Sequence, residues 1–197
     1  MKEYKNSNKK NLKKESTPKS LSDINLFDKR VIHLNKEIDS KVAVDIIEQL
    51  LKLDSIKEKK DIIMYINSPG GSVSDGMAIY DAMQMVKSDV MTICIGRCAS
   101  MASVLLSGGT KGKRYITPNS EVMIHEVSTF SMGKIGDVKV NVDHSNTLNE
   151  RIIRLLANNT GKSKKQIREA LKKDKWFNAE EAINYGVIDR ILTKNPI

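Results

Sequence analysis

The stretch from residue 90 to residue 109 constrains the fold of this chain more than any other. Its first part, residues 90–95, is almost continuously apolar and rich in β-branched side chains, which is typical of a strand buried on both faces. Gly96 is expected to end this strand. From Met101 to Leu106, small and apolar residues recur at spacings that suit a buried helix. We therefore predict that Ser100 lies where a strand turns into the first turn of a helix.

Ser100 has two interpretations in this position. The free N–H groups of a first helical turn favour negative charge. A serine beside them can act as a nucleophile, because its tetrahedral intermediate carries an oxyanion. Serine is also a common helix N-cap without any chemical role. This stretch alone leaves both interpretations open.

The length of the chain, 197 residues with a mass of 22.1 kDa, suffices for one substantial hydrophobic core, so we expect a single domain. No apolar run approaches the roughly 18 residues of a membrane span, and no apolar segment of a signal peptide follows the lysine-rich N-terminus. We therefore expect a cytoplasmic protein. Residues 1–23 are polar and rich in Lys, Asn and Ser, which predicts a disordered basic arm before one domain over residues 24–197.

The formal net charge of +9 would suit a nucleic-acid partner. The charge is concentrated in the N-terminal arm and in a second group, which comprises Lys162, Lys164, Lys165, Arg168, Lys172, Lys173 and Lys175. Neither group is interleaved with aromatic residues or contains a known nucleic-acid motif. We interpret both groups as mostly solvated surface and expect no nucleic-acid partner.

The two cysteines, Cys94 and Cys98, lie in the strand and the turn before Ser100. They have no second cysteine pair or nearby histidine with which to form a zinc site, and we expect no metal. We predict that both are reduced thiols packed in the interior.

The rest of the chain alternates between strand and helix patterns. Strands are predicted at residues 30–34, 61–66, 114–117, 121–125 and 187–192. A helix capped by Asp39 or Ser40 is expected to bury Val42, Val44, Ile46, Ile47, Leu50, Leu51 and Leu53. A helix over about 74–87 is expected to pack through Met77, Ala78, Tyr80, Met83, Met85 and Val86. A long amphipathic helix is predicted over 137–159, and two short capped helices over 163–186. This alternation predicts an α/β fold with a mostly parallel sheet.

The segment from Asn67 to Ser72 contains Pro69, Gly70 and Gly71. Proline fixes φ, and glycine adopts backbone conformations that are closed to other residues. Such a loop can turn bare N–H groups toward a ligand, although an ordinary tight turn before a helix has the same pattern.

His125 is the histidine best placed for chemistry. It ends a predicted strand beside a segment rich in Ser, Thr and Gly, whereas His33 and His144 lie in the middle of a strand and of a helix. A serine nucleophile needs a neutral imidazole to take its proton, and an acid to orient that imidazole. The pattern does not choose among the acids that follow His125, namely Glu126, Asp137, Asp143, Asp174 and Asp189.

Four motifs in order resemble those of the proteolytic subunit of the Clp protease, the ClpP family of serine peptidases (peptidase family S14). They are YINSPGGSV (65–73), GRCASMAS (96–103), KGKRYITPNSEVMIH (111–125), and TGKSKKQI with DKWFNAEEAINYGVID (160–167 and 174–189). The resemblance extends from Val31 to about Leu192.

This resemblance assigns roles to individual residues. It implies that Ser100 is the nucleophile, His125 the general base and Asp174 the acid. It also implies that the backbone N–H groups of Gly71 and Met101 form the oxyanion hole, in which each donor is typically worth about 10²–10³ in rate.

The resemblance also implies a fold and an assembly. The fold is crotonase-like, with repeated β-β-α units and a long helix that protrudes as a handle. Two heptameric rings stack through these handles into a tetradecamer, and an AAA+ unfoldase such as ClpX, ClpA or ClpC feeds protein substrates into it. The subunit itself holds no metal or other cofactor, and ATP is used by the partner ATPase.

Three features depart from the family pattern, as in a divergent paralogue or a phage-encoded version. The lysine-rich arm stands where the family has an apolar and aromatic stretch. Glu126 and Val127 stand where Gln-Pro is common after the histidine, and Lys173 replaces an arginine before the acid. Lysine lacks the bidentate geometry of arginine, so we expect weaker coupling between rings.

Two alternatives to the endopeptidase remain. One is an accessory subunit that completes a mixed ring with an active paralogue, which the unusual N-terminus favours. The other is an acyl-CoA hydratase or isomerase on the same fold, whose chemistry has no use for Ser100, His125 and Asp174 together.

Overall fold

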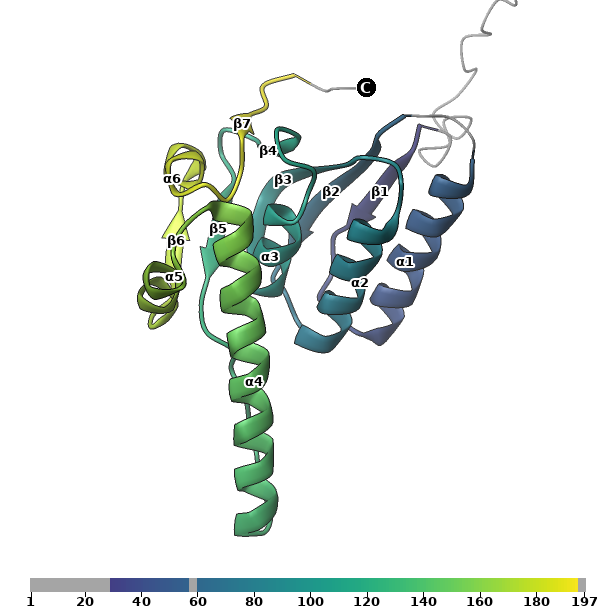
Figure 1. Ribbon diagram of the computed structural model, residues 1–197. Coiled ribbons are helices and arrows are strands. Elements are labelled where there is room, and N and C mark those ends of the chain that lie inside the picture. The colour runs from purple at the N-terminus through teal and green to yellow at the C-terminus, as the bar shows by residue number, and fades with distance from the viewer. Residues whose placement is uncertain (1–28, 57–59, 195–197) are drawn as a thin grey trace, which may run out of the picture.

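The computed structural model describes residues 29–56 and 60–194, so the predicted arm over 1–23 lies outside the described residues. The first elements are β1 (Val31–Leu34), α1 (Ser40–Ser55), β2 (Ile62–Ser68), α2 (Val73–Met85), β3 (Val90–Ala99) and α3 (Met101–Ser107). They are followed by β4 (Arg114–Ile116), β5 (Glu121–Ile124), α4 (Ile135–Thr160), α5 (Lys164–Leu171), β6 (Lys175–Phe177), α6 (Ala179–Tyr185) and β7 (Arg190–Ile191) (Figure 1).

The sheet is dominated by parallel pairing, as predicted from the alternation of strands and helices. Its main path runs β1-β2-β3-β4-β7, with every neighbour parallel. β5 joins β3 in parallel, and β6 adds to β5 as the one antiparallel pair within the described residues. The chain therefore has the mixed α/β architecture that the family resemblance implied.

β3 is longer than expected, because Gly96 does not end it. Ile66 of β2 pairs with Cys94 of β3, and Ser68 pairs with Cys98. Two residues along β2 therefore correspond to four residues along β3. β3 bulges outward over residues 95–97, which are exposed, and Gly96 has a φ of +86° there. Before the bulge β3 pairs with β4, and after it with β5. The bulge thus lets one strand carry two successive partners and ends at Ser100.

Side chains satisfy the backbone of the bulge. The Gly96 N–H donates to the Ser120 hydroxyl at 2.7 Å, and the Arg97 N–H donates to the Asn67 side chain at 3.2 Å. These hydrogen bonds replace the missing ladder bonds. The bulge also leaves Ile95 47% exposed, so the prediction that residues 90–95 are buried on both faces is wrong at that residue.

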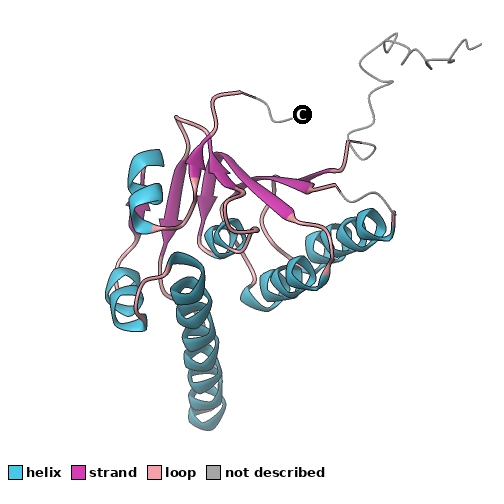
Figure 2. Cartoon of the chain, turned by 45° about the horizontal axis from the view of Figure 1, so that its top comes forward, coloured by secondary structure: helices cyan, strands magenta, loops and turns pink. Residues whose placement is uncertain are grey.

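The helices α1 and α2 cover one face of β1, β2 and β3 (Figure 2). Asp39 caps α1 by accepting a hydrogen bond from the Val42 N–H at 2.7 Å. The buried face of α1 is narrower than predicted, because Val44 and Leu51 are 55% and 50% exposed. Their apolar side chains lie on the side of the helix that faces away from the sheet.

α2 packs through part of the predicted face, since Tyr80 and Met83 are buried and Met77 and Val86 pack against the core. Gly76, Ile79, Tyr80, Ala82 and Met83 are buried, whereas Ala78 and Met85 are exposed. The small residues Gly76 and Ala82 bring the helix close to its neighbours. A count of large apolar residues does not predict such a contact.

α4 is a long helix that projects from the rest of the chain (Figures 1 and 2). Its buried residues, Ile152, Ile153, Leu156 and Ala157, all lie in its last third. The helix ends at Gly161 in the left-handed conformation, as predicted. It corresponds to the handle that the resemblance implied.

The segment after α4 folds back onto β5. α5 and α6 begin with the predicted capping boxes, Ser163 with Gln166 and Asn178 with Glu181. The last strand is much shorter than the predicted 187–192, since only Arg190 and Ile191 pair with β4.

Both cysteines are buried free thiols, which confirms their prediction. Burial, together with the neighbouring Cys94, raises the pKa of the Cys98 thiol well above its usual value. None of the helices in the described part of the chain combines the length and apolar character needed to cross a membrane.

Candidate active site

Ser100 forms the sharp turn between β3 and α3, as predicted. Its φ of 53° and ψ of −125° are unusual for a residue with a side chain, and such geometry typically costs about 1–3 kcal/mol. Two contacts hold it: the Ser100 N–H donates to the Met123 carbonyl at 2.9 Å, and the Ser103 hydroxyl donates to the Ser100 carbonyl at 2.6 Å. Ser100 does occupy the N-cap position of α3, but its hydroxyl accepts no capping hydrogen bond, so its side chain does not cap the helix.

The Gly70–Gly71 loop lies directly against this turn. Gly70 has a φ of +98°, and a Cβ atom there would lie 2.7 Å from the Ser100 Cβ and 2.9 Å from the Met101 nitrogen. Gly71 has a φ of +143° and forms a parallel bridge with Ile38. The bridge uses the Gly70 carbonyl and the Ser72 N–H, so it leaves the Gly71 N–H outside the ladder. The segment is therefore more than an ordinary tight turn.

The Met101 N–H is the second backbone donor beside Ser100. Met101 is the first residue of α3, and the first N–H groups of a helix have no acceptor within the helix. The Met101 side chain is buried against Gly76 of α2, where an added Cβ would lie 2.2 Å from the Met101 Cγ. This packing fixes the start of α3 relative to the glycine loop.

His125 follows directly after β5, at the strand end where it was predicted. Its Nε2 lies 2.8 Å from the Ser100 Oγ, which is a hydrogen-bond distance. β5 positions the ring, because β5 pairs with the last residues of β3 just before Ser100. The next residue is fixed as well, since the Glu126 N–H donates to the Leu171 carbonyl at 3.1 Å.

Asp174 reaches His125 through the antiparallel pair of β5 and β6. Ile124 is paired with Lys175. Because the strands are antiparallel, His125, which follows Ile124, lies beside Asp174, which precedes Lys175. The Asp174 Oδ1 is 3.3 Å from the His125 Nδ1. The Asp174 side chain is 64% exposed, whereas that of His125 is 26% exposed. The structure thus brings Ser100, His125 and Asp174 into one line of contacts.

Of the other acids that the sequence left open, Glu126 is the exposed residue directly after His125, and the rest lie elsewhere. Asp137 and Asp143 are exposed on α4. Among the described residues, Asp174 is the one carboxylate that contacts His125 within ion-pair distance.

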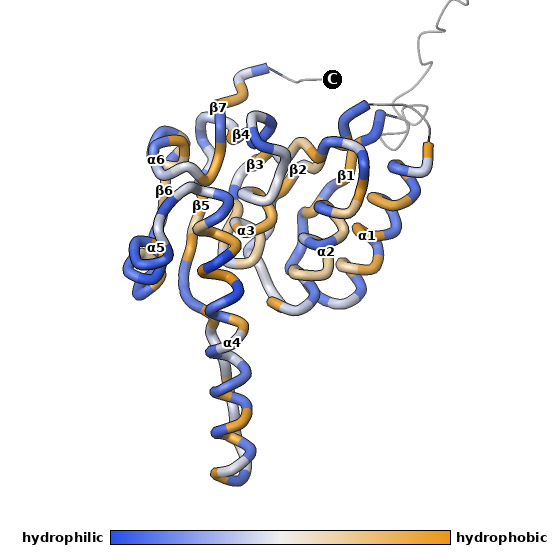
Figure 3. Tube along the Cα trace, viewed as in Figure 1, coloured by the Kyte–Doolittle hydropathy of each residue, from blue (hydrophilic) through white to orange (hydrophobic). Residues whose placement is uncertain are grey.

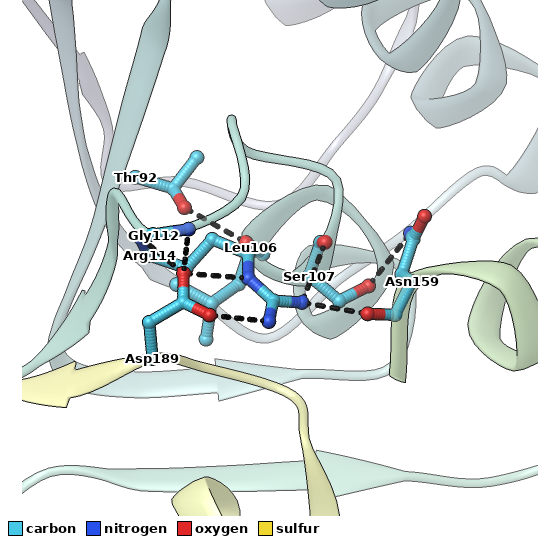
Figure 4. A network of polar contacts seen from close by, with 7 residues as sticks. All are labelled: Thr92, Leu106, Ser107, Gly112, Arg114, Asn159 and Asp189. Carbon is cyan, nitrogen blue, oxygen red and sulfur yellow. Dashed lines mark hydrogen bonds and ion pairs between the residues drawn. The ribbon is translucent and has the colours of Figure 1, made fainter. Parts of the chain in front are cut away.

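Asp189 is committed to a buried ion pair with Arg114 (Figure 4). The Arg114 Nη2 and Nε donate to the two Asp189 carboxylate oxygens at 2.6 and 2.9 Å. The Arg114 Nη1 donates to the carbonyls of Ser107 and Asn159, which ties the ends of α3 and α4 to β4. Burial raises the pKa of Asp189, but the hydrogen bonds and charge of Arg114 and the Gly112 N–H outweigh it, and the pKa is lowered overall.

A family model described as Clp protease matches residues 14–195. The chain belongs to the Clp protease family. Its members are peptidases, so the family assigns peptide-bond hydrolysis to this chain. The match includes the serine, histidine and aspartate described above as well as the glycine loop.

A cavity of about 60 Å³ adjoins Ser100 in this Clp-family chain. The polar part of its wall is formed by Gly71, Ser100, Met101 and His125 with Ser103, Glu126 and Ser128, and the apolar part by Val73, Val104, Ile124, Val127, Ile152 and Leu156. The apolar residues come from α2, α3, β5, the segment after β5 and the buried end of α4. The cavity therefore offers a small apolar surface beside the Ser100 hydroxyl.

Two features of the site escaped the sequence interpretation. β6 is only three residues long, and nothing in its local pattern indicates antiparallel pairing with β5. Ser103 supports the Ser100 carbonyl but looks like any small residue of a buried helix. The other histidines are distant from this chemistry: His33 stacks on Tyr65 with ring centroids 5.6 Å apart, and His144 is exposed on α4.

Proposed function

We propose that this Clp-family peptidase is a serine endopeptidase in which Ser100 is the nucleophile, His125 the general base and Asp174 the orienting acid. The observation that carries the proposal is the 2.8 Å contact between the Ser100 Oγ and the His125 Nε2, with Asp174 at the other ring nitrogen. A serine, an imidazole and a carboxylate in this order are the arrangement that nucleophilic acyl transfer requires.

In the first half of the reaction, the Ser100 Oγ attacks the carbonyl carbon of the peptide bond while His125 takes its proton. His125 then gives the proton to the leaving amine, and an acyl ester on Ser100 remains. In the second half, water attacks the ester with His125 again as the base, the bond between the acyl carbon and the Ser100 Oγ breaks, and His125 returns the proton to the Ser100 Oγ as the acid product leaves. Asp174 keeps the imidazole in the tautomer that presents a lone pair to Ser100.

The backbone N–H groups of Gly71 and Met101 are the proposed oxyanion hole. Neither group is used by the bridge or by α3, and both border the cavity beside Ser100. Fixed donors of this kind stabilise charge that develops only in the transition state. The apolar part of the cavity is the proposed site for the substrate side chain that precedes the scissile bond.

We also propose that the active form is an assembly of two stacked heptameric rings that receives unfolded protein from an AAA+ ATPase such as ClpX, ClpA or ClpC. The Clp protease family generally oligomerises and works with such ATPases. The exposed apolar side chains on the first half of α4, including Ile135 and Val140, support a contact with a second copy. ATP is used by the ATPase, and this subunit needs no cofactor for the proposed chemistry.

The proposal is tested by hydrolysis of short unstructured peptides, with Ser100→Ala as the variant and Ser55→Ala as the control. Loss of the nucleophile should reduce kcat on the order of 10⁶-fold. Ser55 is exposed at the end of α1, and its replacement should leave kcat unchanged. Peptide hydrolysis that survives in Ser100→Ala would contradict the proposal. Turnover of an acyl-CoA substrate by both variants would favour the hydratase or isomerase alternative.

A further inference from the structure

A second and larger cavity also borders Asp174 and is lined by residues of α5, β6 and the end of α6. It has a volume of about 790 Å³ and is lined by Lys162, Gln166, Glu169, Ala170, Lys172, Lys173, Asp174, Lys175, Trp176 and Tyr185. We name it the lysine pocket. Figure 1 places α5, β6 and α6 together at one edge of the molecule, and Figure 3 shows α5 as mostly hydrophilic.

The charge of the lysine pocket is only partly neutralised. Lys172 forms an ion pair with Glu169 at 2.6 Å, and Asp174 contacts His125. Within the described residues, no carboxylate lies within ion-pair distance of Lys162, Lys173 or Lys175. Three ammonium groups therefore border the cavity without an ion-pair partner, and the carboxylate of Asp174, which borders it as well, contacts His125.

Two of these ammonium groups lie over an aromatic ring. The Nζ atoms of Lys162 and Lys175 are 5.5 and 5.0 Å from the centroid of the Tyr185 ring. A ring gives a cation much less stabilisation than a carboxylate does, and the ammonium groups keep free N–H donors. The shared ring holds the two lysines on the same wall, so the donors are partly organised in advance.

The aromatic side chains of the lysine pocket distinguish it from a solvated lysine surface. Trp176 is 45% exposed and lines the same cavity. The Tyr185 hydroxyl is buried without a hydrogen-bond partner in the described part of the chain, and burial raises the pKa of Tyr185. A half-exposed indole beside unneutralised cations offers a flat surface to a planar group as well as donors to an anion.

We propose that the lysine pocket binds a compact anion that carries several phosphate groups. Lysine ammonium groups act as point charges that bind phosphate well, and three of them around one cavity suit several linked phosphates better than a single carboxylate. The ligand comes from one of two sources, an inorganic polyphosphate or a nucleoside polyphosphate whose base stacks on Trp176. This site goes beyond the proposed peptidase activity, because binding there does not require Ser100.

Trp176 is the only tryptophan of the chain, so its fluorescence reports directly on the lysine pocket. The experiment adds tripolyphosphate, without divalent cations, to the assembled protein at low ionic strength. We expect a saturable change in tryptophan fluorescence, with an affinity that falls as salt is added. The variant Lys162→Gln/Lys173→Gln should bind at least tenfold more weakly.

The matched control is Lys164→Gln/Lys165→Gln. It removes the same charge from exposed positions of α5 that do not line the cavity, so its affinity should stay within about twofold of the unmodified protein apart from weak long-range screening. Equal weakening in both double variants would mean attraction by net charge alone and would overturn the proposal. A fluorescence that does not change saturably with tripolyphosphate would overturn it as well.

A second series with ATP, again without divalent cations, identifies the source of the ligand. Tighter binding of ATP than of tripolyphosphate assigns a nucleoside polyphosphate, and equal binding assigns an inorganic polyphosphate. Adenosine that binds as tightly as ATP would overturn a phosphate site. Ser100→Ala should bind tripolyphosphate normally, so failure of the peptidase proposal and failure of this one give different results. If the double lysine variant does not fold, Lys162→Gln alone serves, since the Lys162 side chain makes no hydrogen bond or ion pair with the described residues.

Discussion

The turn at Ser100 and the free half of α4 are two extremes of the same chain. The turn is held by β5, the glycine loop, Ser103 and the packing of Met101, and all of these lie within one copy. The first half of α4 has almost no internal support, and its apolar residues Ile135 and Val140 are 90% and 67% exposed. One chain therefore suffices to align the candidate catalytic groups, whereas the apolar residues on the first half of α4 are left exposed for the proposed contact with a second copy.

Among the variants that keep Ser100, the largest effect is expected from Asp174→Asn, which changes the orientation of His125 but little of the packing. We expect a loss of about 10⁴-fold in kcat for peptide hydrolysis, because the amide favours the wrong imidazole tautomer. The side chain is 64% exposed, so the free energy of unfolding should change by less than about 0.5 kcal/mol. Asp81→Asn at an exposed position of α2 is the control and should leave kcat unaltered. A small effect on kcat at Asp174 would exclude it as the acid.

Asp189→Asn should do the opposite, lowering stability without touching the candidate catalytic groups. The variant leaves Arg114, whose side chain is 5% exposed, without its carboxylate partner, and we expect a loss of about 3 kcal/mol in the free energy of unfolding. Denaturant titration at neutral pH measures it. Glu48→Gln is the control, since its ion pair with Lys52 is exposed and should contribute nothing measurable.

The same pair predicts a dependence on pH. Because the folded pKa of Asp189 is lowered, its stabilisation is fully present above the unfolded pKa of about 4 and is lost as the pH falls through the lower folded value. The unmodified protein should therefore lose more stability than Asp189→Asn between neutral pH and about pH 3. An equal loss of stability in both proteins over this pH range would show that the Asp189 carboxylate does not cause the acid sensitivity.

Gly71→Ala should affect both the fold and the candidate oxyanion hole. A Cβ there would lie 2.3 Å from the Ile38 carbonyl oxygen, so the loop must shift. We expect a loss of about 10²–10³ in kcat, as for removal of one oxyanion donor. Gly133→Ala is a close match, because Gly133 has the same φ of +143° and an added Cβ there would meet nothing within 4 Å. Equal kinetic effects at the two glycines would rule out a specific role for Gly71.

The smallest effect on the single chain, but a clear one on assembly, is expected from Ile135→Ser/Val140→Ser. Both side chains are exposed, so the folding of one chain should be almost unchanged. The mass of the native assembly should fall, because the variant removes apolar surface that a second copy would cover. Lys139→Ser on the same helix is the control. An unchanged mass would show that assembly does not use this half of α4.

The sequence predicted most of the fold and the position of Ser100, because both depend on local patterns. The apolar runs located the strands, and the capping residues located the starts of α1, α5 and α6. The errors arose where distant contacts decide. Gly96 looks like a strand end, but side chains of Asn67 and Ser120 supply the hydrogen bonds that let β3 continue.

The site was predictable to different degrees for different residues. Ser100 and His125 lie at the ends of recognisable strands, so the pattern of residues already singled them out. Asp174 was chosen by family resemblance, because its approach to His125 depends on a three-residue antiparallel strand without a sequence signature. Asp189 looked equally suitable, and only its ion pair with Arg114 shows that it serves the fold.

The most direct test of the central claim is labelling with a fluorophosphonate, which reacts with activated serines, followed by mass determination of the native assembly. The account predicts one label per chain, located at Ser100 and absent from Ser100→Ala, on a particle of about fourteen subunits. A large ring that takes up no label would contradict the peptidase proposal and favour the accessory subunit. A small oligomer without label would contradict both the peptidase and the ring.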